Sequence, residues 1–189
     1  LQYLFCDSLL VAPVTTQGAS SVKIQFPKGR WVSLWDGSVM EGNTEQTVSA
    51  TLDTIPVYLE AGSAFPVTLG EELKIDGVNT LGKNVNALMV APAVEKKVNT
   101  FYADKEEKYV YTSDILAEGS YSLAADKVSD KRIVVVKGLV SDHVNEDGVE
   151  LKELKKRPTS QTTEQGFYCD AENNTTIIVT DGSWSRLEY

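Results

Sequence analysis

The sequence predicts an all-β fold made of two small, consecutive antiparallel β-sandwich domains with little or no helix. Many short segments alternate apolar and polar residues, which is typical of strands with one buried and one exposed face. These segments are rich in β-branched and aromatic residues and are separated by Gly, Asn, Asp or Ser. Because they recur at intervals of roughly 8 to 12 residues, they favour β-sandwiches over helical or mixed folds.

Five or six short strands are expected in the first 70 residues. Residues 22–26 alternate apolar and polar side chains and end at the turn Pro27-Lys28-Gly29. Residues 30–35 follow and end at Asp36-Gly37, a hairpin signal because glycine accepts a positive φ without strain. The other strands expected here are residues 46–52, 55–60 and 63–67.

The second half of the chain repeats this pattern with different turns. Only residues 150–157 resemble a helix, and Pro158 would end such a helix within about two turns, so we expect a strand and a loop there. The strands expected in this half are residues 87–91, 97–102, 109–111, 121–124, 132–137, 166–169 and 175–180.

The two domains are expected to meet in a connection with weak patterning. Residues 70–84 are rich in Gly, Asp and Asn and show no clear hydrophobic period. We therefore place a boundary near Leu81, with a first sandwich at residues 1–80 and a second at residues 81–189. No sequence repeat relates the two halves.

The composition excludes several classes of partner. The 189 residues include 18 basic and 27 acidic side chains, a net charge of −9, and 42% hydrophobic residues. No apolar stretch approaches the roughly 18 residues needed to cross a bilayer, so we expect no membrane partner. Nucleic acid is not expected either, because its phosphates require a concentrated basic face. The densest basic cluster is Lys152, Lys155, Lys156 and Arg157, which we interpret as a solvated surface.

The start of the sequence has neither an initiator Met nor the basic-then-apolar order of a signal peptide. We therefore expect the chain to be a piece of a longer protein. The two cysteines form no disulfide pattern, which leaves the compartment open with a slight preference for a bacterial cytoplasm.

No catalytic, cofactor-binding or metal-binding residue is assigned from the motifs. Cys6 is interpreted as a small buried hydrophobe, and a disulfide between Cys6 and Cys169 stays an open alternative. His143 is the sole histidine, which excludes a multi-histidine metal cluster and indicates an exposed loop residue. Residues 142–148 and 170–174 offer oxygen ligands for calcium, but their spacing is not that of an EF-hand and Asn/Asp turns account for both. The dipeptide Asp53-Thr54 lacks the glycine of an aspartic-protease loop.

A family resemblance rests on ordered motifs in the first third of the chain. The motifs are QYLFCDSLLVAPV at residues 2–14, FPKGRW at 26–31, LWDG at 34–37 and LDTIPVYLEAGS at 52–63. In this order they resemble the segment that leaves the catalytic barrel, and the sandwich after it, in glycoside hydrolase family 31, the α-glucosidase and α-xylosidase family. Cys6 stands where that family usually has Gly, and Glu60 where Arg is frequent.

The resemblance is carried by residues 1–67 and becomes faint beyond them. Residues 88–92 and 101–104 resemble the strand and acidic turn that open the distal sandwich of the family. The chain departs from the usual turn at Tyr102-Ala103-Asp104-Lys105-Glu106.

The resemblance implies that the catalytic machinery lies elsewhere. The family carries a retaining pair of aspartates on a (β/α)₈ barrel that precedes these motifs, and none of the matched motifs holds a catalytic residue. The parent enzyme would hydrolyse α-glycosidic bonds through a covalent glycosyl-enzyme intermediate, without a cofactor or metal. This chain alone is then expected to be inactive, with the parent's own barrel as its partner and carbohydrate reached only through that parent. The glycoside itself is not readable, because the discriminating pocket is absent.

Large aromatic side chains predict a supporting role for the first sandwich. Trp31, Trp35, Tyr58 and Phe65 are difficult for a sandwich of about 70 residues to cover completely. We expect some of them to pack against the barrel, with residues 1–14 as the covalent and packing bridge. The alternative is that both tryptophans fill the core of the sandwich itself.

Two other classes stay open at this point. A stand-alone carbohydrate-binding or cell-surface adhesion sandwich would use exposed aromatics, such as Tyr102, Tyr109, Tyr111 and Trp184, to stack on sugar rings. The alternation of Tyr109 and Tyr111 fits a core face equally well. An inert structural repeat of a surface protein is the third class.

Overall fold

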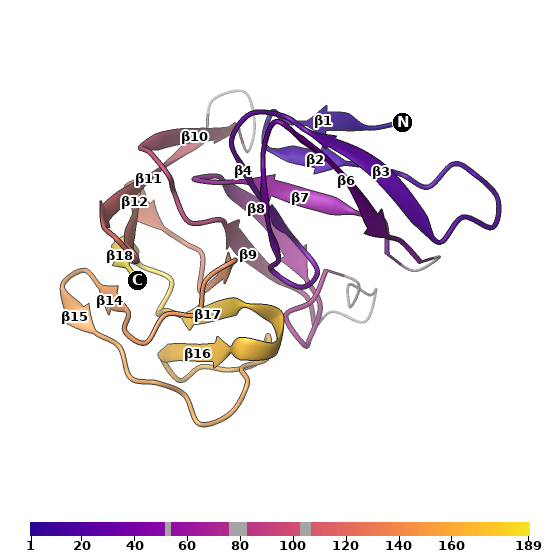
Figure 1. Ribbon diagram of the computed structural model, residues 1–189. Helices are drawn as coiled ribbons and strands as arrows, with labels where there is room; N and C mark the ends of the chain where they lie inside the picture. The colour runs from indigo at the N-terminus through magenta and orange to yellow at the C-terminus, as the bar shows by residue number, and fades with distance from the viewer. Residues whose placement is uncertain (52–53, 76–82, 103–106) are drawn as a thin grey trace.

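The computed structural model describes residues 1–51, 54–75, 83–102 and 107–189 (Figure 1). Among these residues the secondary structure is strand, apart from one 3₁₀ turn at Ala171–Asn173, so the predicted all-β sandwich class is confirmed. No helix in the described part of the chain is long and apolar enough to cross a bilayer. Three expectations involve residues outside the described ranges: the boundary near Leu81, Asp53 of the dipeptide Asp53-Thr54, and the turn at 103–106. The division at residue 80 therefore stays a prediction.

The strands of the described residues form four sheets, which we number 1 to 4 in their order of packing. Sheet 1 pairs β3 (Ser21–Phe26) with β6 (Thr44–Ser49). Sheet 2 has the order β1 (Tyr3–Phe5), β2 (Leu9–Val11), β7 (Val57–Glu60), β4 (Arg30–Ser33) and β5 (Val39–Glu41).

Sheet 3 has the order β16 (Gly166–Asp170), β17 (Thr175–Val179), β13 (Ile133–Lys137), β9 (Val85–Val90) and β8 (Ala64–Leu69). Sheet 4 has the order β10 (Lys97–Tyr102), β11 (Lys108–Ala117), β12 (Ser120–Ser129), β18 (Trp184–Glu188), β14 (Asn145–Glu146) and β15 (Val149–Glu150).

Sheet 2 contributes alternate residues of the same strands to two different cores. Because successive side chains of a strand point to opposite faces, residues that are adjacent in a strand of sheet 2 lie in different cores. The core shared with sheet 1 contains Leu10, Trp31 and Tyr58. Leu9 and Leu59 point the other way, into a core that sheet 2 shares with sheet 3.

Sheet 3 is buried on both faces in the same way. Val135 and Ile177 lie in the core shared with sheet 2, whereas Val134 and Ile178 lie in the core shared with sheet 4. Every residue of β13 and β17 is buried. This explains the unbroken apolar run in β13, since a strand that is covered on both sides loses the apolar and polar alternation. The two sandwiches therefore pack against each other through a third core.

One pair in sheet 3 departs from the antiparallel pattern that the sequence analysis expected. β13 pairs antiparallel with β17 but parallel with β9. The chain leaves β9, forms the β10, β11 and β12 strands of sheet 4, and then returns to sheet 3 at β13. Such a crossover to a second layer is what a parallel pair requires.

The strand expected at residues 63–67 is present as β8, but it belongs to sheet 3 and not to the first sandwich. β8 pairs with β9 from Ala64 opposite Val90 to Leu69 opposite Val85. The chain therefore leaves sheet 2 directly after the turn at Gly62, where φ is +77°.

Residues 150–157 contain no helix, as expected. β15 ends at Glu150, and Glu153 makes an isolated bridge to Phe167. The strands β1, β2, β5, β14, β15 and β18 were not expected from the sequence. β14 and β15 have two residues each, which is too short to show a period.

Cys6 is exposed, so the expectation of a buried residue was wrong, and both cysteines are free thiols. The reason is the tight turn between β1 and β2, where the Ser8 amide donates to the Phe5 carbonyl at 3.3 Å. Both central residues have positive φ, +50° at Cys6 and +53° at Asp7. Such turns favour Gly, Asn and Asp, which accounts for the glycine that the resembling family has at this position.

Cys6→Gly is expected to raise the free energy of unfolding by about 0.5–1 kcal/mol, because glycine adopts the left-handed conformation without strain. Urea denaturation followed by circular dichroism measures the change. Cys6→Ala is the control, since it removes the thiol and keeps the Cβ. An equal gain from the alanine variant would assign the effect to the thiol and contradict the backbone explanation.

Val135→Ala is expected to lower the free energy of unfolding by about 2 kcal/mol, because it removes buried methyl groups between sheets 2 and 3. Since sheet 3 shares its two faces with both neighbours, thermal unfolding should stay a single transition at a lower temperature. Val149→Ala, at a side chain that is 66% exposed, is the control. Two separate transitions, of which only one moves, would show that the sandwiches unfold independently.

Candidate functional site

The structure buries two of the four aromatics that were expected to face a neighbour. Trp31 and Tyr58 lie in the core between sheets 1 and 2, where Tyr58 meets Phe26 edge to face. The Trp31 indole donates to the Pro27 carbonyl at 3.0 Å. Its polar nitrogen is thus satisfied inside the sandwich, and the alternative that this tryptophan fills its own core is correct.

Trp35 and Phe65 are only partly buried and lie at the boundaries between sheets. The Trp35 indole donates to the Ile55 carbonyl at 2.8 Å, and the side chain lines a small cavity together with Lys137. Phe65 joins two further rings. Its centroid lies 6.3 Å from that of Phe5 and 5.6 Å from that of Phe101, so the three rings connect sheets 2, 3 and 4.

The most exposed apolar segment is β1, which lies at the edge of sheet 2 (Figure 1). Tyr3, Leu4 and Phe5 are 51%, 47% and 51% exposed. Because side chains alternate along a strand, Tyr3 and Phe5 point to one face and Leu4 to the other, and both faces are uncovered. An edge strand that is apolar on both sides is a surface that proteins normally cover.

A hollow of about 650 Å³ continues this apolar surface beside the turn between β1 and β2. Its apolar lining is Phe65, Val98 and Phe101. We call β1 together with this hollow the apolar face. It joins the first sandwich to the β10 strand of sheet 4.

Two sets of polar contacts, which we call the polar joints, connect the sandwiches. At the first, the Lys97 ammonium pairs with Glu60 and donates to the Ser63 hydroxyl at 2.9 Å. The buried Asn99 amide donates to the Gly62 carbonyl at 3.0 Å. β10 is therefore fixed directly against the turn between β7 and β8.

The second joint connects the turn after β4 to the ends of β13 and β17. The Lys137 ammonium donates to the Trp35 carbonyl at 3.2 Å, and the Asn174 amide donates to the Gly37 carbonyl at 3.0 Å. Burial lowers the pKa of Lys137 to about 8, with the nearby Asp170 carboxylate opposing the shift. The lysine is thus held largely protonated at neutral pH in a position that disfavours its charge.

The aromatic residues considered for sugar stacking differ in their burial. Tyr111 and Trp184 are buried in the core between sheets 3 and 4, whereas Tyr102 is exposed and Tyr109 partly buried. His143 is exposed in a loop, as expected, 2.7 Å from Asp142.

In each of the two candidate calcium segments, one carboxylate is engaged by other groups of the protein. Asp147 accepts hydrogen bonds from Ser185 and Arg186, and Asp170 pairs with Arg157. Hydrogen bonding lowers the pKa of Asp147 and Asp170 against the opposing effect of burial. No group of three or more His, Cys, Asp or Glu residues in the described part of the chain is arranged to hold a metal ion.

The basic cluster divides into exposed and paired side chains. Lys152, Lys155 and Lys156 are exposed, which agrees with a solvated surface, while Arg157 is partly buried against Asp170. The sequence analysis expected residues 1–14 to pack against a neighbour, but it did not identify which of these side chains are exposed on β1. Its residues are apolar, and apolar residues in a short strand are normally taken as core.

The fold belongs to the class of tandem β-sandwiches, in which two sandwiches pack against each other. The cycloalternan-forming enzyme from Listeria monocytogenes, solved with a pentasaccharide substrate, has the same fold with a TM-score of 0.78 at 22% identity. That match covers 99% of this chain and 18% of the other.

The sequence of the first sandwich matches a family model. Residues 1–65 match the glycosyl hydrolase family 31 C-terminal domain, so the resemblance of the motifs to this family is confirmed. The isomaltosyltransferase of Sporosarcina globispora is 33% identical over 86 residues, which are 46% of this chain and 8% of that protein. Alpha-glucosidase 2 of Bacillus thermoamyloliquefaciens is 37% identical over 70 residues, 37% of this chain and 9% of that protein. The chain spans less than a tenth of the length of these two relatives.

Lys137→Met is expected to remove a pH dependence of stability. Because the pKa is about 8 in the folded state and about 10.5 in the unfolded state, the unfolded chain binds more protons between these values. The stability of the native protein should therefore rise relative to the variant as pH increases from 7 to 10, on the order of 2–3 kcal/mol. Chemical denaturation across this range measures the difference, with the exposed Lys96→Met as control. A constant difference between native protein and Lys137→Met would contradict the prediction.

Proposed function

We propose that this chain is the non-catalytic C-terminal part of a retaining, α-glucosidase-like family 31 glycoside hydrolase, and that it supports the catalytic barrel of that enzyme. The family match of residues 1–65 supports the assignment. So do the relatives, whose names describe a glucosidase and an isomaltosyltransferase and which are more than ten times the length of the matched segment.

The observation that carries the supporting role is the exposure of β1. Leu4 and its neighbours leave large apolar side chains in water on both faces of one edge strand. Burying a leucine and a tyrosine side chain is worth about 2–3 kcal/mol each, so a partner that covers them gains substantial stability. A barrel packed on the apolar face would supply that cover, and the direct chain connection would hold it at a high effective concentration.

The structure supports a scaffold and not an active site for hydrolysis. Retaining glycosidases need two carboxyl groups about 5–5.5 Å apart that face a sugar-binding cleft. The two carboxylates described above, the exposed Asp147 and the buried Asp170, instead accept hydrogen bonds that stabilise turns. The way in which the module affects catalysis would be indirect, through the position of the barrel loops that contact it.

The double variant Tyr3→Ser/Leu4→Ser tests the proposed docking. In the enzyme that contains the barrel, it should lower the free energy of unfolding by about 3 kcal/mol, because apolar area is no longer buried between the parts. In the 189-residue chain alone it should have almost no effect, since these side chains are already exposed. Differential scanning calorimetry of both proteins measures this contrast.

Val149→Ser is the matched control, because Val149 is an exposed apolar residue on β15, away from β1 (Figure 1). It should leave both proteins unchanged. Equal stability of the barrel-containing enzyme with and without the double change would contradict docking through β1. Hydrolysis of a synthetic α-glucoside by the chain alone, lost on replacement of one of its own acids, would contradict the non-catalytic assignment.

A further inference from the structure

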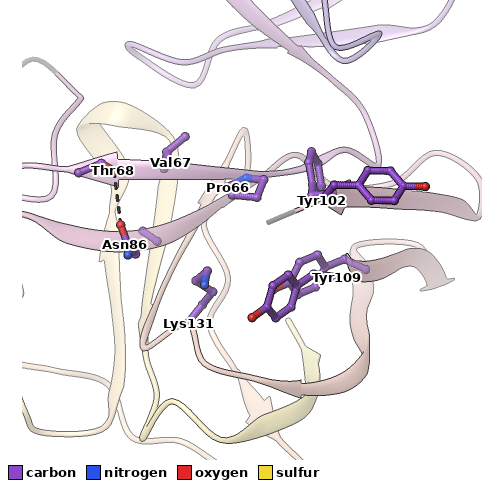
Figure 2. Close-up of a pocket in the computed structure, with 10 residues that line it drawn as sticks. Pro66, Val67, Thr68, Asn86, Tyr102, Tyr109 and Lys131 are labelled. Atoms are coloured by element: carbon purple, nitrogen blue, oxygen red, sulfur yellow. Dashed lines mark hydrogen bonds between the residues drawn. The ribbon is translucent and has the colours of Figure 1, made fainter. Parts of the chain in front are cut away.

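A cavity of about 290 Å³ lies between the edge of sheet 3 and the side of sheet 4 (Figure 2), and it shares Pro66, Phe101 and Tyr102 with the hollow of the apolar face. Pro66, Thr68 and Asn86 line it from β8 and β9, and Tyr109 and Lys131 from the opposite side. Its volume is at the lower limit of small-molecule sites, and it combines aromatic, apolar and hydrogen-bonding groups. We propose that this cavity binds one neutral hexopyranose ring of an oligosaccharide.

The aromatic part of the lining suits the apolar face of a sugar. A pyranose ring has C–H groups on its faces and hydroxyl groups around its rim, so it packs on aromatic rings while its rim stays hydrogen-bonded. Figure 2 shows the Tyr109 ring extending from β11 toward Lys131. Phe101 and Pro66 add apolar surface to the lining.

The charges around the cavity are compensated, which favours a neutral ligand. Lys131 is the charged residue of the lining, and its ammonium pairs with Asp130 and lies 5.4 Å from the Tyr109 ring centroid. Its side chain is only 14% exposed. The Tyr109 hydroxyl donates to Glu107 at 3.0 Å, which raises the pKa of the tyrosine and keeps it neutral. Among the described residues that line the cavity, a phosphate or carboxylate would find no unpaired cation.

The polar part of the lining is available for ligand hydroxyls. Thr68 and Asn86 are directly opposite each other in the pairing of β8 and β9, and both are exposed. The contact between them is a long hydrogen bond, 3.4 Å from Thr68 Oγ1 to Asn86 Oδ1. Within the described residues the structure gives the Asn86 amide nitrogen no partner. An amide and a hydroxyl side by side can donate to and accept from neighbouring sugar hydroxyls.

This sugar site does not depend on the proposed scaffold role, because its lining comes from described residues of this chain and requires no contact with a barrel. The site would hold an oligosaccharide near the module without reacting with it. Its lining contains Tyr102, Tyr109 and the almost fully buried Tyr111 from the aromatics that the sequence analysis considered for sugar stacking, and the buried Trp184 is not part of it.

Titration of the ¹⁵N-labelled 189-residue chain with maltotriose, followed by amide chemical shifts, tests the proposal. Saturable shifts are expected at Thr68, Asn86, Tyr109 and Lys131, with a dissociation constant in the millimolar range, as for a single ring with few hydrogen bonds. Asn86→Ala should weaken binding about tenfold, because it removes hydrogen bonds that the ligand makes with the amide. Tyr109→Leu should weaken it further by removing the ring while keeping an apolar side chain.

Gln46→Ala is the matched control, because Gln46 is an exposed amide side chain in a strand of sheet 1 that lines none of the cavities described. It should leave the shifts and the affinity unchanged. Absence of saturable shifts, or shifts at other residues that Asn86→Ala does not reduce, would overturn the site. Tighter binding of glucose 6-phosphate than of maltotriose would overturn the neutral ligand. None of these outcomes alters the barrel-docking test, so the two proposals fail separately.

Discussion

The structure depends on the burial of sheet 3 on both of its faces. Val134 and Val135 are adjacent in sequence, yet they stabilise different cores, one shared with sheet 4 and the other with sheet 2. Because the same strands close both cores, the relative position of the two sandwiches is determined by side-chain packing and not only by their covalent connection. A linker that merely joined two independent domains would not produce this arrangement.

The packing of the layers makes the two sandwiches one rigid module. The two polar joints, Glu60 with Lys97 and Trp35 with Lys137, lie where the packed layers meet and restrict rotation of one sandwich on the other. A module that is rigid in this way can transmit the position of a docked neighbour. The apolar face needs this rigidity, since it combines β1 of sheet 2 with β10 of sheet 4. The proposed sugar site needs it as well, because its residues come from sheets 3 and 4.

Much of the fold could be predicted because the alternation of residues is a local property. β10 has the same limits as the expected strand at residues 97–102, and β3 exceeds the expected 22–26 by one residue. β18 was not predicted, because Trp184 and Leu187 are both buried although they are three residues apart. A register shift in the pairing of β12 and β18 reconciles this spacing with one buried face. Such irregularities depend on the partner strand, which the local pattern does not contain.

The candidate sites were less predictable. Thr68, Asn86 and Tyr109 are far apart in sequence and meet only because β8 pairs with β9 and sheet 4 lies across them. Trp31 was expected to be a candidate for contact with a neighbour, but alternation identifies two faces of a strand without showing which of them is covered. For residues 1–14 a packing contact with a neighbour was expected, but the exposure of the individual β1 residues could not be predicted. Their composition is that of a core strand, and only the tertiary position at the edge of sheet 2 leaves them in water.

The sequence by itself determined the all-β class, most of the strands and the resemblance of residues 1–67 to family 31, because alternation, turn residues and motif order are all read along the chain. The tertiary structure alone decided that β8 joins sheet 3, that the two sandwiches share a core, and which aromatic side chains are exposed. The physical reason is that local preferences select strands, whereas the pairing and stacking of strands depend on contacts between residues distant in sequence.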